Sequence, residues 1–144
     1  MTENMDHKTG PNVAGVRKPQ LASSPAKPFG PARISHWSDA AEFGLLGTYA
    51  MDFETTGEAA PWTLAYEESV YVVRGEAWVV ELDADGGEVC TERATAGELI
   101  AIRRGTTVRY GGETNTRLLL SIAPVNWDIA PTGTTTANRI QSER

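Results

Sequence analysis

The chain contains 144 residues, of which 40% are hydrophobic and 22% are charged, and this composition is typical of one folded domain rather than a disordered chain. Its net charge of −6 opposes binding to nucleic acid, because phosphates repel an acidic surface. No apolar run approaches the roughly 20 residues of a membrane span, and no apolar segment typical of a secretory signal stands near the N-terminus. We therefore expect a cytoplasmic protein with neither a nucleic-acid nor a membrane partner.

The single cysteine, Cys90, excludes a disulfide framework and a cysteine-based zinc cluster. Free cysteines usually behave as small hydrophobic residues, so we expect Cys90 to be half buried on a strand.

The two ends of the chain differ in composition from its middle. Residues 1–33 contain five prolines and carry a net charge of +3, so the remainder carries −9. Because proline fixes φ and removes a backbone donor, this segment predicts an extended arm with no core of its own. Such an arm is most often a solvated tail, and a lid over the folded part is the alternative. The polar residues 131–144 predict a loose tail, which leaves residues 34–130 as the folded domain.

A short helix is predicted near residues 35–46. Ser38 is a suitable N-cap residue, acidic side chains follow it in the first turn, and Phe43 and Leu46 would face the core.

From Gly47 onward, apolar residues alternate with polar ones, as half-buried strands require. Residues 83–87 form a strong hairpin-turn signal between two of these segments. The predicted strands are 49–54, 62–66, 69–75, 77–82, 88–92, 99–102, 108–110 and 117–122. Short strands at this spacing, with almost no helix, predict an all-β sandwich or barrel.

Several residues at or near the ends of these strands resemble the sequence motifs of the cupin superfamily. Glu68 followed by Gly75 resembles the end of the first cupin motif, and Gly97-Glu98 followed by Gly105 resembles the second. The resemblance implies a single double-stranded β-helix, a jelly-roll barrel whose open mouth houses the site. It also implies a homodimer.

One stretch is similar to the ethanolamine-utilisation Q branch of that superfamily. Its residues are Trp62-Thr-Leu-x-Tyr66-x-Glu68-x-x-Tyr71-Val-Val-x-Gly75, together with Pro124-x-Asn-Trp127. This resemblance covers about residues 45–128. It implies an accessory protein of ethanolamine utilisation with acetate-kinase-type activity.

The metal ligands of other cupins are not conserved at the matching positions of this chain. Metal-binding cupins place histidines where this sequence has Trp62, Leu64 and Val108, and only Glu68 is kept. The two histidines of the chain, at positions 7 and 36, lie outside the predicted strands. A single carboxylate among apolar side chains does not hold a divalent transition metal, so we predict no metal and no other cofactor.

Counting by two from these positions predicts the side chains that face the barrel interior. As residues that bind a small, largely apolar substrate we assign Met51, Phe53, Trp62, Leu64, Val70, Val72 and Val108. The same counting points Glu68, Tyr66 and Tyr110 inward, and we assign these three as catalytic.

Glu68 is the sharpest catalytic candidate. Enclosure by apolar side chains raises the pKa of a carboxyl group, which suits a general acid or base near neutral pH. Tyr66 and Tyr110 would donate hydrogen bonds to a developing oxyanion. The alternative is a structural carboxylate paired with Arg103, Arg104 or Arg109 at the rim of the barrel, although Arg109 alternates with Val108 and should point outward.

Three functions remain open at this stage. The first is a metal-independent enzyme, a cyclase, isomerase or lyase, that templates a small apolar molecule with acid/base help from Glu68. The second is the accessory role in ethanolamine utilisation that the resemblance implies. The third is a non-catalytic small-molecule binder.

Overall fold

The computed structural model describes residues 15–38 and 43–128, and this part of the chain contains eleven strands, one 3-10 turn at Leu21–Ser23 and no α-helix. The strands are β1 (Ala26–Phe29), β2 (Ala32–Ser38), β3 (Gly47–Phe53), β4 (Gly57–Glu58), β5 (Trp62–Thr63), β6 (Glu67–Arg74), β7 (Glu76–Leu82), β8 (Glu88–Thr95), β9 (Leu99–Ile102), β10 (Thr107–Gly112) and β11 (Arg117–Ala123).

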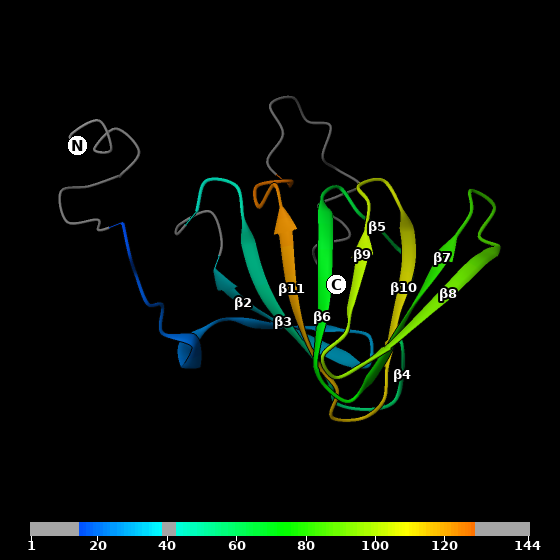
Figure 1. The fold of residues 1–144 in the computed structure, drawn as a ribbon, viewed down its shortest axis with the longest axis horizontal. Coiled ribbons are helices and arrows are strands. Elements are labelled where there is room, and N and C mark those ends of the chain that lie inside the picture. Colours follow the sequence, from blue (N-terminus) through cyan, green and yellow to red (C-terminus); the bar gives the residue numbers. More distant parts are fainter. Residues whose placement is uncertain (1–14, 39–42, 129–144) are drawn as a thin grey trace.

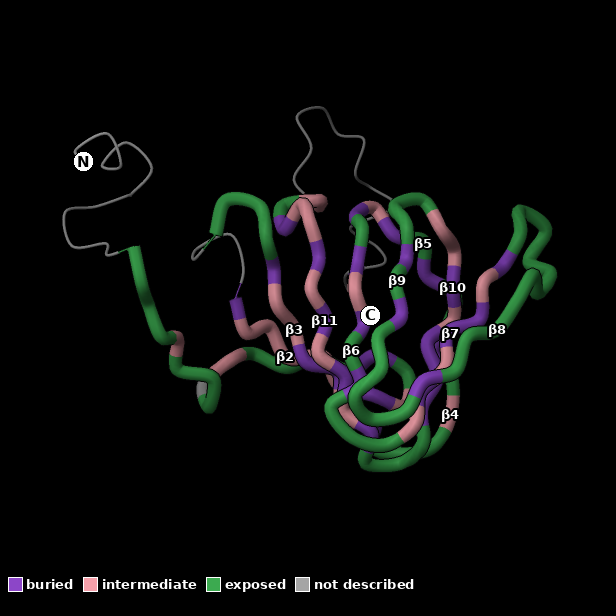
Figure 2. Tube along the Cα trace, in the orientation of Figure 1, coloured by how far each residue is buried: buried purple, intermediate pink, exposed green. Residues whose placement is uncertain are grey.

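The strands form two antiparallel sheets that enclose one core (Figure 1). The six-stranded sheet has the order β1-β2-β3-β11-β6-β9, and the five-stranded sheet has the order β4-β10-β7-β8, with β5 paired to β10. Buried and exposed residues alternate along most strands, because successive side chains point to opposite faces (Figure 2). Strand β8 is the exception and is exposed along nearly its whole length.

The predicted all-β barrel is confirmed, and each predicted strand segment overlaps an observed strand. The predicted alternation in β3 is also correct, since Met51 and Phe53 are buried and Tyr49 packs against the core. No helix among the described residues is long and apolar enough to cross a membrane.

The short helix predicted near residues 35–46 is wrong. Its first residues belong to β2, which pairs with β3 so that Ile34 lies opposite Met51. Phe43 and Leu46, which were expected to face the core, are 46% and 44% exposed. Ser38 itself is the last residue of β2 and lies opposite Thr48 in the β2–β3 ladder. Residues 39–42 lie outside the described part.

The boundary of the predicted N-terminal arm is also corrected. Residues 26–29 form β1, an edge strand that pairs with β2, and edge positions are where a sheet tolerates a proline such as Pro28. Phe29 is 5% exposed and belongs to the hydrophobic core. The last third of the predicted arm is therefore part of the barrel. Residues 1–14, and the tail predicted for 131–144, lie outside the described residues.

Gly75, which carries part of the motif resemblance, stands in the tight turn between β6 and β7. Its φ of +93° lies in the region that side chains disfavour. A Cβ atom at this position would lie 2.8 Å from the Cα atom of Thr116, which is fully buried. The close approach of two backbones therefore requires glycine here.

Candidate functional site

The sharpest predicted site residue, Glu68, faces Tyr110 across the barrel. Glu68 lies on β6 of the six-stranded sheet, and Tyr110 lies on β10 of the five-stranded sheet. The Tyr110 hydroxyl donates a hydrogen bond of 2.5 Å to Oε1 of Glu68. Glu68 and Tyr110 are only 5% and 2% exposed. The two sheets thus bring together two groups that stand 42 residues apart in the chain.

The surroundings of Glu68 keep its carboxyl group protonated at neutral pH. Burial raises the pKa of Glu68 to about 8, although the hydrogen bond from Tyr110 acts in the opposite direction. Burial also raises the pKa values of Tyr66 and Tyr110 well above the ordinary tyrosine value, and the nearby Glu68 carboxylate adds to both shifts. All three groups are therefore neutral near pH 7, and the two hydroxyls remain hydrogen-bond donors.

The alternative assignment of Glu68 as a partner of a rim arginine is wrong. Its hydrogen-bond partner is Tyr110, not Arg103, Arg104 or Arg109. Arg109 points outward as predicted, and it forms ion pairs with Glu58 at 2.9 Å and Glu88 at 2.6 Å.

Tyr66 belongs to a group of aromatic side chains beside the Glu68–Tyr110 pair. The indole Nε1 of Trp62 donates a 2.8 Å hydrogen bond to the Tyr66 hydroxyl. Trp127 contacts both rings, with centroid distances of 5.9 Å to Trp62 and 5.3 Å to Tyr66. Phe29 meets Trp62 and Tyr110 edge-on, at 5.7 and 5.9 Å. These contacts fix the rings around the buried carboxyl group.

The residues predicted to bind substrate point into the barrel as expected, and all are buried. They are Met51, Phe53, Trp62, Leu64, Val70, Val72 and Val108. They pack against one another in the single core cluster, and their role in substrate binding stays a prediction. Of these, Val108 also lines an open cleft.

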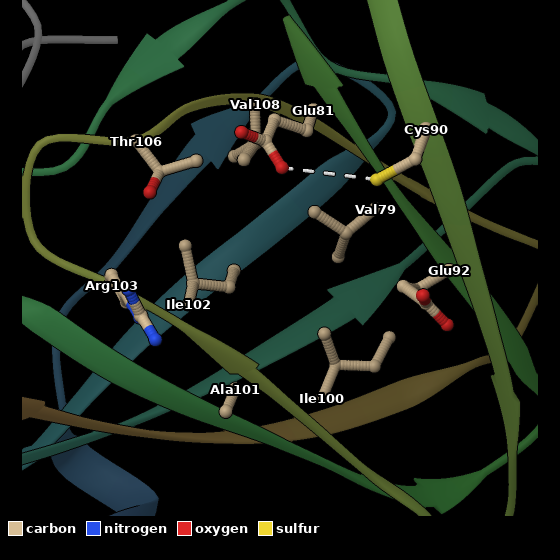
Figure 3. A pocket seen from close by; sticks show the side chains of 10 residues that line it. All are labelled: Val79, Glu81, Cys90, Glu92, Ile100, Ala101, Ile102, Arg103, Thr106 and Val108. Carbon is tan, nitrogen blue, oxygen red and sulfur yellow. Dashed lines mark hydrogen bonds between the residues drawn. The ribbon is translucent and has the colours of Figure 1, made fainter.

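This cleft lies between β8 and β9, the edge strands of the two sheets, and has a volume of about 330 Å³ (Figure 3). Its lining residues are Val79, Glu81, Cys90, Glu92, Ile100, Ala101, Ile102, Arg103, Thr106 and Val108. The four aliphatic side chains at positions 79, 100, 102 and 108 are buried and form an apolar floor. Figure 3 shows Cys90 and Glu92 on one side of the cleft, and Arg103 and Thr106 on the other.

Strand register places the cleft next to the buried pair. Ile102 of the cleft is the cross-strand neighbour of Glu68, and Val79 is the cross-strand neighbour of Tyr110. Residues directly opposite on an antiparallel pair share one face, so these cleft residues and the Glu68–Tyr110 pair lie on the same inner faces. The pair therefore lies directly behind the floor of the cleft, although neither Glu68 nor Tyr110 lines the cleft itself.

The polar residues of the cleft were missed in the sequence. They are Glu81, Cys90, Glu92, Arg103 and Thr106. The hairpin turn predicted at residues 83–87 could have identified three of them, Glu81, Cys90 and Glu92. It pairs β7 with β8, so that Glu81 stands opposite Cys90 and Val79 stands opposite Glu92. Counting by two from Val79 along this hairpin would have placed these side chains on the inner face.

Cys90 differs from the prediction of a half-buried strand residue. It lies on β8 but is exposed, because the cleft leaves this strand open. Its thiol donates a weak hydrogen bond to Glu81 at 3.8 Å. Partial desolvation, followed by the negative charges of Glu81 and Glu92, raises the pKa of Cys90. The thiol therefore stays protonated near neutral pH, which is the wrong state for a nucleophile.

The residues present do not fit the metal that many cupins hold. At the matching positions, Trp62, Leu64 and Val108 offer no metal ligand, and an oxygen of Glu68 already accepts the Tyr110 hydrogen bond. The described residues contain no group of three or more histidine, cysteine or acidic side chains that could hold a metal ion. The donor set is therefore unsuited to a divalent transition metal.

Residues 39–129 match the model of a protein family described as ethanolamine utilisation protein EutQ. The chain belongs to the EutQ family. The matched stretch contains the buried pair and every residue of the cleft. A curated EutQ relative, the acetate kinase EutQ of Salmonella typhimurium, is 37% identical over 67 residues, which is 46% of this chain. The match spans only 27% of the length of that relative.

Solved structures support the cupin fold. Ethanolamine utilization protein Q of Salmonella typhimurium has a TM-score of 0.63 and 24% identity, over 78% of this chain and 89% of that one. The Clostridium difficile EutQ protein has a TM-score of 0.53 and 24% identity, over 67% and 66% of the two chains. An RmlC-like cupin from Shewanella frigidimarina has a TM-score of 0.55 and 18% identity, over 72% and 86%. The EutQ matches support the ethanolamine-utilisation alternative rather than the cyclase, isomerase or lyase interpretation.

Proposed function

We propose that this EutQ-family protein acts in ethanolamine utilisation by binding a small molecule in the barrel cleft, beside the Glu68–Tyr110 pair. The observation that carries the proposal is a cleft whose floor residues Ile102 and Val79 are the cross-strand neighbours of Glu68 and Tyr110, inside the stretch that matches the EutQ family. A cleft of about 330 Å³ with an apolar floor and a few polar side chains has the character of a small-molecule site.

In this proposal, Glu68 holds and supplies a proton. At neutral pH its buried carboxyl group keeps the proton that an exposed glutamate has lost, because burial raises its pKa to about 8. The Tyr110 hydroxyl donates to Oε1 and fixes the orientation of the carboxyl group. A neutral acid held in this way is suited to hydrogen-bond or protonate an oxygen of a molecule that reaches it past Ile102 from the cleft.

The name of the curated relative favours acetate-kinase-type activity as a second candidate. In that reaction the γ-phosphoryl group of ATP is transferred to a carboxylate oxygen of acetate, which gives ADP and acetyl phosphate. The charges of the cleft oppose this candidate, since two carboxylates, Glu81 and Glu92, stand against one guanidinium, Arg103. Polyphosphate sites normally carry cationic side chains or backbone N–H cradles.

Calorimetric titration tests the proposal. The protein is titrated separately with ethanolamine, acetate, acetyl phosphate and Mg-ATP at millimolar concentrations, and acetyl phosphate formation is assayed from ATP and acetate. We expect saturable heat with at least one of the small molecules. No heat with any of the four compounds would overturn the small-molecule role, and sustained formation of acetyl phosphate would replace it with the kinase.

A further inference from the structure

Two acidic side chains and one basic side chain line opposite sides of the cleft between β8 and β9 (Figure 3). Glu81 lies on β7 directly opposite Cys90 of β8, and Glu92 lies two residues further along β8 on the same inner face. Diagonal neighbours on one face of an antiparallel pair stand about 7–8 Å apart, so both carboxylates border the same part of the cleft. Arg103 follows β9 and lies on the other side, beside Thr106 (Figure 3).

None of these charged groups forms an ion pair within the part of the chain that the structure describes. Within residues 15–38 and 43–128, the ion pairs include neither Glu92 nor Arg103, and Glu81 is bonded only to the Cys90 thiol. Charged side chains on the outer face of the same sheet are paired, as the Arg109 ion pairs with Glu58 and Glu88 show. The carboxylates at the cleft are thus available to a ligand.

We propose that the cleft binds an organic monocation of the amino-alcohol class, with its ammonium group between Glu81 and Glu92. The hydroxyl end of the molecule would reach Arg103 and Thr106 on the opposite side, and its methylene chain would lie on the apolar floor. The inference deepens the proposed function and rests on it, because it names the chemical class that the cleft takes.

Three physical points support this class over an anion or a neutral molecule. The three formal charges that line the cleft sum to −1, so an anion meets net repulsion. An ammonium group has three donors and accepts none, which matches two carboxylates on one side of the cleft. Desolvation, followed by the negative charges of Glu81 and Glu92, raises the pKa of Cys90, and the same negative charges would attract a cation.

The apolar floor predicts a dependence on chain length. Val79, Ile100, Ile102 and Val108 are buried and present only aliphatic atoms. A cleft of about 330 Å³ is larger than ethanolamine requires, so longer amino alcohols should bury more apolar surface in it. Each additional methylene group buried in this way strengthens binding by up to about fourfold.

The test is a calorimetric titration of the chain with ethanolamine, 3-aminopropanol and 5-aminopentanol, and with the diols of matching length as neutral controls. We expect the amines to bind more tightly than the diols, with affinity rising along the series and falling with added salt. Glu92→Gln and Glu81→Gln are each expected to weaken amine binding by about tenfold. The matched control is Glu67→Gln, which removes the same charge from an exposed residue outside the cleft lining.

Methyl NMR of isoleucine-labelled protein locates the ligand independently of its affinity. We expect the resonances of Ile100 and Ile102 to shift on titration with 5-aminopentanol, while that of Ile34 on β2 stays unchanged. Equal affinity for amines and diols, or equal effects of Glu92→Gln and Glu67→Gln, would overturn the amino-alcohol inference. Acetate or acetyl phosphate that bound while the amines did not would overturn it too, but would leave the proposed small-molecule function intact.

Discussion

Replacing Phe29 with alanine is expected to lower the free energy of unfolding by about 3–5 kcal/mol, the usual loss for a large aromatic residue removed from a core. Phe29 is 5% exposed and meets the rings of Trp62 and Tyr110 edge-on. Its removal would leave a cavity beside the Tyr110 ring that holds Glu68. Urea unfolding followed by tryptophan fluorescence measures the change.

Lys27→Ala is the matched control for this variant. Lys27 lies on the same strand, β1, and is exposed, so its truncation is expected to change the free energy of unfolding by less than about 0.5 kcal/mol. The comparison separates packing of β1 against the core from any general effect of changing this strand. Equal unfolding midpoints for the two variants would contradict the finding that β1 belongs to the barrel.

Glu68→Gln is expected to remove a pH dependence of stability. The pKa of Glu68 is about 8 in the folded chain against its ordinary value of 4.5. Between these values the folded chain keeps a proton that the unfolded chain has lost. The contribution of Glu68 is therefore full below about pH 4.5 and is lost as the pH rises to about 8, with a slope near 1.4 kcal/mol per pH unit.

The measurement is urea unfolding of the wild-type chain, Glu68→Gln and Glu67→Gln at several pH values between 5 and 9. Tyr66 and Tyr110, the titratable groups beside Glu68, stay protonated across this range because burial raises their pKa values. We expect the slope to be shallower in Glu68→Gln than in the other two proteins. A slope that Glu68→Gln leaves unchanged would contradict the protonated state assigned to this carboxyl group.

Much of the barrel could be predicted from local patterns. Alternation with a period of two is a property of a single strand, and it placed Met51, Phe53, Val70 and Val72 on the buried face without any knowledge of their partners. Strands β1 and β2 were missed because proline, glycine and charged residues dominate residues 26–33, while the pairing of β1 with β2 and of β2 with β3 makes them strands. Phe29 is a core residue only because that pairing exists.

The chemistry of the site was only partly accessible from the sequence. Burial of Glu68 followed from its apolar neighbours, but the choice of Tyr110 over an arginine as its partner depends on how two separate sheets face each other. The acidic side of the cleft depends on the register of the β7–β8 hairpin, which has an irregularity between Glu81 and Leu82. A shift of one residue there would turn Cys90 and Glu92 outward. The homodimer implied by the resemblance stays a prediction.

The most direct test of a neutral carboxyl group beside the cleft is a ¹³C NMR titration of the glutamate side-chain carboxyl carbons between pH 4 and 10. We expect one carbon to titrate near pH 8, far above the others, and this signal to be absent from Glu68→Gln. If every glutamate carboxyl carbon instead titrated below about pH 6, Glu68 would be an ionised residue at neutral pH, and the proton-holding role assigned to the Glu68–Tyr110 pair would be contradicted.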